Sequence, residues 1–227
     1  MNGPEAAVAF HRLTRHGSPV DRSMLVDFPP LDPSNRPAPF KRYERLETRP
    51  LPRDIGAGTG GRLDEAELGR LLFLTGGVSR VSDSPAFDER TYFRTAMSAG
   101  NLHPVELYVL DGSGVHHYDP LGHGLTQLRD QAFDGTSVVL TGIPWRTSWK
   151  YGERGFRHLY WDAGGMVANL LAVAESDGLS AAHVFLGFDD ALVARVLGID
   201  GLTEVPLAIV TLDASAPDWP EVEPVRL

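Results

Sequence analysis

Residues 105–118, VELYVLDGSGVHHY, predict a β-hairpin, and the segments around it predict further strands. Residues 105–110 and 115–118 are rich in the β-branched, aromatic and aliphatic side chains that favour strands. The four residues between them, Asp-Gly-Ser-Gly, have the composition of a tight turn. Three other apolar runs are short enough for strands, namely 137–141, 182–186 and 206–212.

Helices are predicted among these strands. Apolar residues repeat at helical spacing over 159–174, and Gly178 follows as a C-terminal stop. A shorter helix is expected at 190–197, and Asp64 is placed to cap a helix that ends at Gly76-Gly77. Because helices and strands mix without the strict alternation of a doubly wound sheet, the expected fold class is α+β.

The first 61 residues differ in composition from the rest of the chain. Eight prolines interrupt positions 19–52, so that no long periodic pattern survives there. Apolar residues such as Phe10, Phe40 and Tyr43 favour an arm that packs on the domain or across a partner subunit. The glycine-rich residues 56–61 are interpreted as a flexible hinge. We therefore expect an arm and hinge at 1–61 and a folded domain at 62–227.

The hinge also matches the dinucleotide-binding pattern G-x-G-x-x-G through Gly56, Gly58 and Gly61. That pattern binds a pyrophosphate only where a strand leads directly into it. Two prolines within 49–54 exclude a central strand there. The glycines are therefore expected to form a hinge and no Rossmann site.

Composition narrows the classes of function. The 227 residues carry a formal net charge of −9, which disfavours general nucleic-acid binding. The chain has no cysteine, which excludes disulfides, thiolate metal sites and cysteine nucleophiles. No apolar run approaches the roughly 20 residues of a membrane helix, and no secretory signal is visible. We expect a cytoplasmic protein that binds neither nucleic acid nor membrane.

The histidines and serines suggest neither a metal site nor a serine nucleophile. His116 and His117 would point to opposite faces of a strand, so they and His123 are expected to form hydrogen bonds and to bind no metal. No G-x-S-x-G elbow is present, so Ser98 is not expected to be a nucleophile.

Residues 94–104, RTAMSAGNLHP, concentrate polar groups directly ahead of the strand predicted at 105–110. Gly100 would let a ligand approach the backbone closely, and the surrounding side chains offer a cation, a hydroxyl, an amide and an imidazole. Such a loop can bind the polar edge of a flat heteroaromatic ring. The alternative is a polar loop capped by its own side chains.

Residues 149–158, WKYGERGFRH, precede the strongest predicted helix. Arg154 and Arg157 are three positions apart, so on a helix they share a face and can grip an anion. Lys150 lies next to Tyr151 among aromatic residues, a setting in which it can act as a base. The alternative is a solvated entry into the helix.

Both segments resemble motifs of the SagB/ThcOx-type dehydrogenases, which are flavin enzymes of the nitroreductase superfamily. Residues 94–110 resemble the signature R-x-x-P-S-A-G-x-x-x-P-x-E-x-Y. Residues 150–154, KYGER, and the later DAG at 162–164 with Asn169 resemble the block K-Y-x-x-R … D-A-G-x-x-x-x-N. Weaker similarity extends to the family's closing segment, at 187–188 and 197–200, and to its lead-in, at 10–14 and 40–43.

The resemblance implies a nitroreductase-like α+β fold with a central, mostly antiparallel sheet flanked by helices and an extended N-terminal arm. It further implies bound FMN, a homodimer, and no metal. Members of this type oxidise thiazoline or oxazoline rings in ribosomally made peptides to thiazoles or oxazoles, beside a cyclodehydratase. The expected substrate is therefore a modified peptide, and a cyclodehydratase is an expected partner.

The resemblance also assigns residues. The cofactor-binding residues would be Arg94, Ser98, Gly100, Asn101, His103, Arg154, Gly187 and Phe188, with Gly187 and Phe188 closing over the ring. The catalytic residues would be Lys150 and Tyr151. The ring proton would be taken by Lys150, or by Tyr151 with its pKa lowered by Lys150.

Two departures from the family pattern leave alternatives open. Residues 55–61 replace the arginine-rich R-R-S-x-R element that holds the FMN phosphate, and Met97 stands where the signature has proline. The candidate replacements for the arginines are Arg80, Arg90, Arg154 and Arg157. The alternatives are a nicotinamide-driven flavin reductase of nitro compounds or quinones, and a flavin-free homologue that serves as a scaffold in a peptide-modifying complex.

Overall fold

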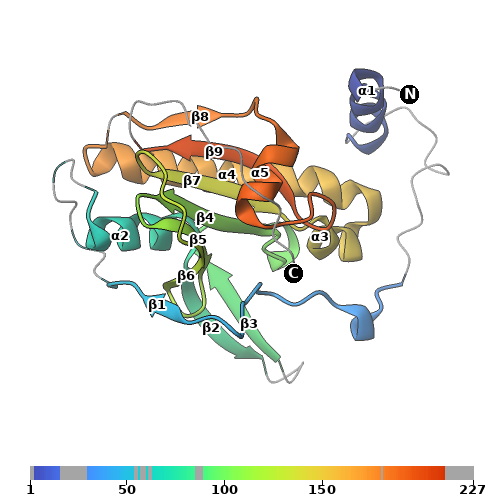
Figure 1. The fold of residues 1–227 in the computed structure, drawn as a ribbon. Coiled ribbons are helices and arrows are strands. Elements are labelled where there is room, and N and C mark those ends of the chain that lie inside the picture. Colours follow the sequence, from blue (N-terminus) through green and yellow to red (C-terminus); the bar gives the residue numbers. More distant parts are fainter. Residues whose placement is uncertain are drawn as a thin grey trace.

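A seven-stranded antiparallel sheet forms the centre of the molecule, and a two-stranded hairpin projects from it (Figure 1). The computed structural model describes residues 3–15, 30–53, 56, 60, 63–84, 89–179 and 181–212. The strand order is β1 (Thr48–Pro50), β6 (Gly124–Arg129), β5 (Gly114–Asp119), β4 (Val105–Asp111), β7 (Ser137–Gly142), β9 (Val205–Thr211) and β8 (His183–Phe185). The hairpin consists of β2 (Val78–Ser84) and β3 (Glu89–Arg94).

Five helices accompany the strands in the described parts of the chain. They are α1 (Gly3–Thr14), α2 (Glu65–Gly76), α3 (Pro144–Tyr151), α4 (Gly155–Ser176) and α5 (Asp190–Leu197). The expected α+β class and the mostly antiparallel sheet flanked by helices are both confirmed. None of the helices in these ranges has the length and hydrophobicity of a membrane-spanning segment.

The predicted hairpin at 105–118 is confirmed as the β4–β5 pair, with Tyr108 opposite His117 and Asp111 opposite Gly114. Gly114 has a φ of +136°, and a Cβ on it would lie 2.0 Å from the carbonyl oxygen of Arg129. Only glycine allows the neighbouring strand β6 to approach this closely. The turn residue thus fixes how β5 and β6 pair.

The helices with a strong apolar period were predicted correctly. Asp64 caps α2 by accepting hydrogen bonds from the amides of Ala66 and Glu67, both at 3.0 Å. The strands at 137–141, 182–186 and 206–212 and the helices at 159–174 and 190–197 all occur, with small differences at their ends.

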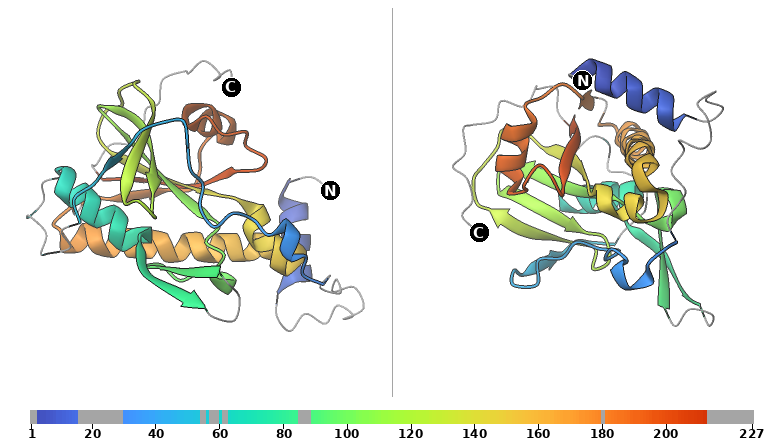
Figure 2. Two further views of the ribbon diagram at one scale, coloured as in Figure 1. Left: turned by 90° about the horizontal axis from the view of Figure 1, so that it is seen from below. Right: turned by 90° about the vertical axis from the view of Figure 1, so that its right-hand side faces the viewer.

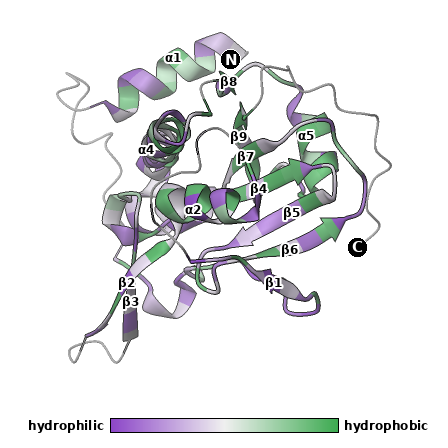
Figure 3. Ribbon diagram, turned by 90° about the vertical axis from the view of Figure 1, so that its left-hand side faces the viewer, coloured by the Kyte–Doolittle hydropathy of each residue, from purple (hydrophilic) through white to green (hydrophobic). Residues whose placement is uncertain are grey.

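Other elements were missed because they lack a buried periodic face. Helix α1 lies ahead of the prolines at 19–52 and was not predicted, and Thr14 is its one buried residue. The β2–β3 hairpin carries many polar and charged residues and points away from the main sheet (Figure 3). Strand β1, which contains Pro50, lies at the edge of the sheet, where a missing amide is tolerated. Most of the predicted hinge lies outside the described residues, so the boundary at 61 and 62 stays a prediction.

Alternation along β4 divides the apolar core between the two faces of the sheet. Val105, Leu107 and Val109 pack with α2 and α4 in one cluster, whereas Tyr108 and Leu110 pack with α5 in the other. Figures 2 and 3 show α4 and α5 on opposite sides of the strands. Burial of these side chains supplies the main driving force for this arrangement.

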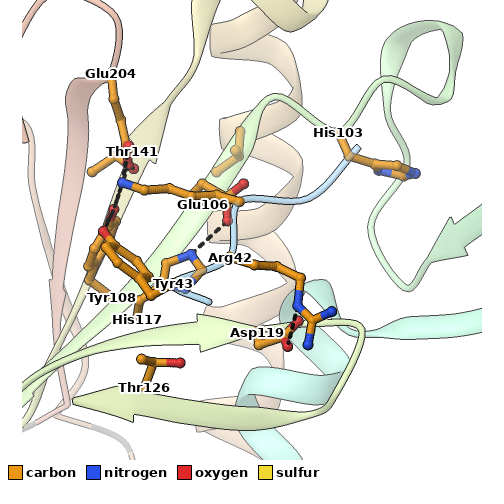
Figure 4. Close-up of polar contacts among 12 residues, drawn as sticks. Arg42, Tyr43, His103, Glu106, Tyr108, His117, Asp119, Thr126, Thr141 and Glu204 are labelled. Carbon is orange, nitrogen blue, oxygen red and sulfur yellow. Dashed lines mark hydrogen bonds and ion pairs between the residues drawn. The ribbon is translucent and has the colours of Figure 1, made fainter. Parts of the chain in front are cut away.

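A layer of buried charged groups lies on the α5 side, beneath the arm residues 30–46 (Figure 4). Glu106 of β4 pairs with Arg146 of α3, and its second oxygen lies 2.9 Å from Nε2 of His117. Arg146 also donates to the carbonyls of His103, at 2.8 Å, and Ala38, at 3.1 Å. The arm is therefore bonded to the sheet through groups that lie out of solvent.

A second ion pair anchors the next part of the arm. Nζ of Lys41 lies 2.6 Å from Oε2 of Glu204, and the hydroxyl of Tyr108 donates to the other oxygen of that carboxylate at 2.8 Å. Burial lowers the pKa of Lys41, but Glu204 and Tyr43 together raise it by a larger amount, so that the net pKa lies above its ordinary value. Lys41 is thus charged when the arm is docked.

The Glu106–Arg146 pair should be essential for stability. Arg146→Met would leave Glu106 buried beside His117 without its cationic partner, and removal of one partner of a buried pair costs about 3–5 kcal/mol. Urea unfolding at pH 7 should show a loss of this size. The double variant Glu106→Leu/Arg146→Met should recover most of it, because no charge then remains unpaired. A double variant as unstable as the single one would contradict this account.

The same pair predicts a pH dependence. Burial raises the pKa of Glu106. Arg146, followed by His117, lowers it, and together these groups outweigh the effect of burial, so that the net pKa lies well below the ordinary value of 4.5. A depressed carboxyl pKa contributes stability above the unfolded-state pKa and loses it as the pH falls toward the folded-state pKa. The stability difference between the wild type and Arg146→Met should therefore shrink as the pH falls below about 4. Unfolding curves across this range measure it.

Candidate functional site

The loop that joins β3 to β4 has an unusual backbone. Gly100, Asn101 and His103 have φ angles of +63°, +58° and +47°. Such angles cost a non-glycine residue about 1–3 kcal/mol, and strained residues of this kind concentrate at functional sites. The loop is therefore held in place by contacts that offset this cost.

Ser98 and Asp162 supply the first of these contacts. The hydroxyl of Ser98 donates to Oδ2 of Asp162 at 2.6 Å and accepts from the amide of His103 at 2.8 Å. The amide of Ala99 donates to Oδ1 of Asp162 at 3.1 Å. Burial raises the pKa of Asp162, and the hydrogen bonds from Ser98 and Ala99 offset part of that rise. Helix α4, which carries Asp162, thus fixes the start of the loop.

The carbonyl of Tyr92 in β3 holds the other half of the loop. It accepts from Nδ2 of Asn101 at 2.9 Å and lies 3.2 Å from Nε2 of His103. Nε2 is also 2.9 Å from Oδ1 of Asn101, so both of its neighbours are acceptors and Nε2 must carry the proton. Nδ1 of His103 is then a lone-pair acceptor, buried and without a hydrogen-bond partner among the described residues.

His103 is neutral at pH 7. Burial, followed by the charge of Arg94, lowers its pKa from 6.5 to about 4. The ring is only 3% exposed, so the loop presents an acceptor nitrogen in a poorly solvated position. An unsatisfied acceptor of this kind is costly in a folded protein unless a ligand satisfies it.

Lys150 and Tyr151, at the end of α3, lie directly against Gly100. A methyl group on Gly100 would sit 2.7 Å from the Tyr151 hydroxyl and 3.3 Å from Nζ of Lys150. Nζ of Lys150 lies 5.5 Å from the centre of the Tyr151 ring. The two segments singled out in the sequence, 94–104 and 149–158, therefore meet at this glycine.

The pKa of Tyr151 departs from the expectation. Burial and the Asp162 carboxylate raise it above its ordinary value of 10.0, whereas a lowered pKa was expected. The reason is that α4 brings a carboxylate to this side of the ring, which sequence neighbours could not reveal. Tyr151 is therefore a protonated hydroxyl at neutral pH.

The loop also lines a pocket of about 570 Å³. Its lining comes from the arm (Pro33, Arg36, Pro37, Ala38, Pro39), from β3 (Arg90, Thr91, Tyr92) and from the loop (Asn101, His103). We call it the arm pocket. Its lining joins three segments that are distant in the sequence.

Arg94 and Arg154, two arginines of the predicted site, belong neither to the pocket lining nor to the contacts of Gly100. Arg94 is buried, donates to the carbonyl of Val105 at 3.1 Å and stacks over Phe40 at 5.3 Å, so it belongs to the charged layer beneath the arm. Arg154 donates to the carbonyl of Thr14 at 2.7 Å, and thus holds α1 against α4. Arg157, the proposed partner of Arg154 in gripping an anion, likewise donates to the Thr14 hydroxyl, at 2.8 Å.

Gly187 and Phe188 also lie apart from the loop. They follow β8, which is three strands away from β4 in the sheet. Phe188 is half-buried and packs in the cluster beneath α5. Within this one chain they are not brought to Gly100.

The histidines considered for a metal each have other partners. His116 hydrogen-bonds Ser113, His117 hydrogen-bonds Glu106, and His123 lies 2.9 Å from both the Tyr118 hydroxyl and the Pro52 carbonyl. No cluster of three or more His, Asp or Glu side chains placed to hold a metal ion occurs among the described residues.

Sequence reasoning did not assign several residues of the site. Asp162 had been noted only as part of a motif, although a carboxylate among the buried positions of an apolar helix is a signal that could have identified it. The Tyr92 carbonyl and Arg36 carried no signal, because their roles depend on how the hairpin and the arm pack.

Comparison with known proteins identifies the family. Residues 63–212 match the Nitroreductase family. A protein of Methanocaldococcus jannaschii whose name assigns it to the nitroreductases is 28% identical in an alignment of length 148 that covers 56% of this chain and 70% of that protein. The microcin B17-processing protein McbC of Escherichia coli is 27% identical in an alignment of length 139 that covers 49% of this chain and 51% of McbC.

Solved structures agree with this fold. A protein of Anabaena variabilis described as a nitroreductase superposes with a TM-score of 0.73 at 23% identity, over 96% of this chain and 52% of that one. A chain of the Escherichia coli microcin synthetase McbBCD complex, solved with truncated pro-MccB17, gives 0.54 at 22% identity, over 92% and 93% of the two chains. This chain spans about half the length of McbC and of the Anabaena protein. With two thirds of its residues in the family match, the chain belongs to the Nitroreductase family of oxidoreductases.

Proposed function

We propose that this chain is an FMN-dependent dehydrogenase that oxidises azoline rings in a modified peptide to azoles. The observation that carries the proposal is the contact of Gly100 with Lys150 and Tyr151, which joins the two segments that resemble the azoline dehydrogenases. The similarity to McbC, a microcin-processing protein, supports a peptide as the substrate. Fold alone would not settle the reaction, so the assignment depends on these residues.

The residues around the loop fit the polar edge of a flavin ring. Gly100 lies directly against the Tyr151 hydroxyl and Nζ of Lys150, and the buried Nδ1 of His103 is an acceptor that lacks a partner within the described chain. A flavin ring carries both donors and acceptors along one edge, so a neutral imidazole beside an amide complements it. When bound, FMN supplies the hydride acceptor for the reaction.

The protein must remove a proton from the azoline ring and hold that ring in place. We assign proton removal to Nζ of Lys150. Tyr151, whose raised pKa keeps it protonated, donates a hydrogen bond that orients the substrate. Asp162 positions both groups indirectly, because it fixes the loop through Ser98 and faces Tyr151.

The proposal includes a homodimer and a cyclodehydratase as a partner enzyme. Met97, next to Ser98, is 84% exposed, and Tyr160 and Trp161 on α4 are each 52% exposed. Exposed apolar side chains favour contact with another protein. Gly187 and Phe188 would close over the ring only if another subunit brought them there.

Lys150→Ala should abolish turnover while the protein stays yellow. General-base catalysis contributes on the order of 10²–10⁴-fold, so the variant should lose at least a hundredfold. The measurement is anaerobic bleaching of the bound flavin by a synthetic peptide that contains one thiazoline or oxazoline. Glu153→Ala, an exposed neighbour, serves as the control and should keep full activity.

Three outcomes would contradict this assignment. Undiminished bleaching in Lys150→Ala would remove Lys150 from the mechanism. Bleaching of the wild type by NAD(P)H alone, with none by the peptide, would identify a nicotinamide-driven reductase. A colourless protein that takes up no FMN would favour the flavin-free scaffold.

Gly100→Ala should weaken flavin binding. The alanine would be strained at a φ of +63° by about 1–2 kcal/mol, and its methyl group would collide with the Tyr151 hydroxyl. Gly164→Ala in α4 is a matched control, because a Cβ there meets no atom within 4 Å. Flavin titrations followed by fluorescence should show weaker binding in Gly100→Ala and wild-type affinity in the control. Equal affinities would show that the ring does not bind at this loop.

A further inference from the structure

The arm pocket has the composition of an anion-binding site. Its two ionised side chains are those of Arg36 and Arg90, and its lining includes no aspartate or glutamate. This contrasts with the whole chain, whose formal net charge is −9. Guanidinium groups bind phosphate or carboxylate with paired hydrogen bonds, so the pocket selects an anionic ligand against the overall charge of the protein.

The loop contributes polar, uncharged residues to the pocket. His103, which is 97% buried, and Asn101 both belong to the lining. The volume of about 570 Å³ is within the range of pockets that hold cofactors and other small ligands. The pocket therefore offers two guanidinium groups to an anion, together with polar, uncharged side chains for the rest of a ligand.

The pocket adjoins the residues that contact Gly100. Nε1 of Trp149 donates to the carbonyl of Asp32 at 2.9 Å, and the guanidinium of Arg36 lies 6.0 Å from the centre of the Trp149 ring. Trp149 directly precedes Lys150 in α3. On the loop side, Asn101 directly follows Gly100. The lining of the arm pocket therefore begins one residue from Gly100.

We propose that Arg36 and Arg90 bind the phosphate of FMN in the arm pocket, and so replace the arginine element that residues 55–61 lack. This inference rests on the proposed function. Arg36 comes from the arm and Arg90 from β3, so the phosphate site joins two segments outside the predicted phosphate element. Of the other candidates, Arg154 and Arg157 donate to α1, and Arg80 stacks over Phe93 at 3.9 Å.

Arg90 can exchange its present partner for a phosphate at small cost. Its Nε lies 3.3 Å from Oδ1 of Asp83, in an ion pair whose side chains are 68% and 83% exposed. Solvated pairs of this kind contribute little to stability. A phosphate with close to two negative charges is a stronger partner for the guanidinium groups of one pocket than a single solvated carboxylate.

The test compares FMN with riboflavin, which has the same ring and ribityl chain but no phosphate. Flavin fluorescence titrations would give the affinities of both for the full chain and for Arg36→Gln, Arg90→Gln and the double variant. Each single variant should lose on the order of tenfold or more in FMN affinity and keep its riboflavin affinity. Arg80→Gln, on the same hairpin but outside the pocket lining, is the matched control and should change neither.

The outcomes separate this inference from the proposed function. A wild type that prefers FMN to riboflavin, with the preference abolished in the double variant, supports the inference. A preference that survives in the double variant, or equal binding of both flavins by the wild type, overturns the phosphate site and leaves the flavin proposal standing. A wild type that binds neither flavin overturns both. Competition by inorganic phosphate against FMN, and not against riboflavin, gives a second measure that does not depend on the variants.

Discussion

The buried guanidinium of Arg146 connects the parts of the molecule on which the site depends. It pairs with Glu106 in the central strand β4 and donates to the carbonyls of His103 in the loop and Ala38 in the arm. The same helix, α3, carries Arg146 near its start and Lys150 and Tyr151 at its end. Separating a buried charge from its partners costs several kcal/mol, about 3–5, so these contacts determine the position of α3 relative to the loop.

The loop itself combines strain with several hydrogen bonds. Its left-handed residues are unfavourable alone, but Asp162 and the Tyr92 carbonyl hold the two halves of the loop in place. The result is an edge that is already ordered before a ligand arrives, with a neutral imidazole among its groups. An ordered site loses less conformational entropy on binding, which favours affinity for a rigid ring.

The arm contributes to the pocket although it precedes the region that defines the family. The family match begins at residue 63, whereas residues 33–39 form one wall of the arm pocket. The ion pair between Lys41 and Glu204 holds the arm on the sheet, and the hydrogen bond from Trp149 to the Asp32 carbonyl holds it on α3. The position of Arg36 therefore depends on contacts that lie outside the shared part of the fold.

Local residue spacing is enough to predict the elements whose apolar residues repeat at a fixed period. The hairpin at 105–118 and the helices at 159–174 and 190–197 follow from local spacing and turn composition, and so does the concentration of polar groups at 94–104. Which of those groups lie at a pocket depends on how the chain packs. Arg94 is buried, and Arg154 donates a hydrogen bond to α1. Arg36 and His103, which are 67 positions apart in the sequence, line the same pocket. The physical reason is that periodicity reports which face of an element is buried, whereas the pairing of distant segments depends on how their buried charges and side-chain volumes fit together.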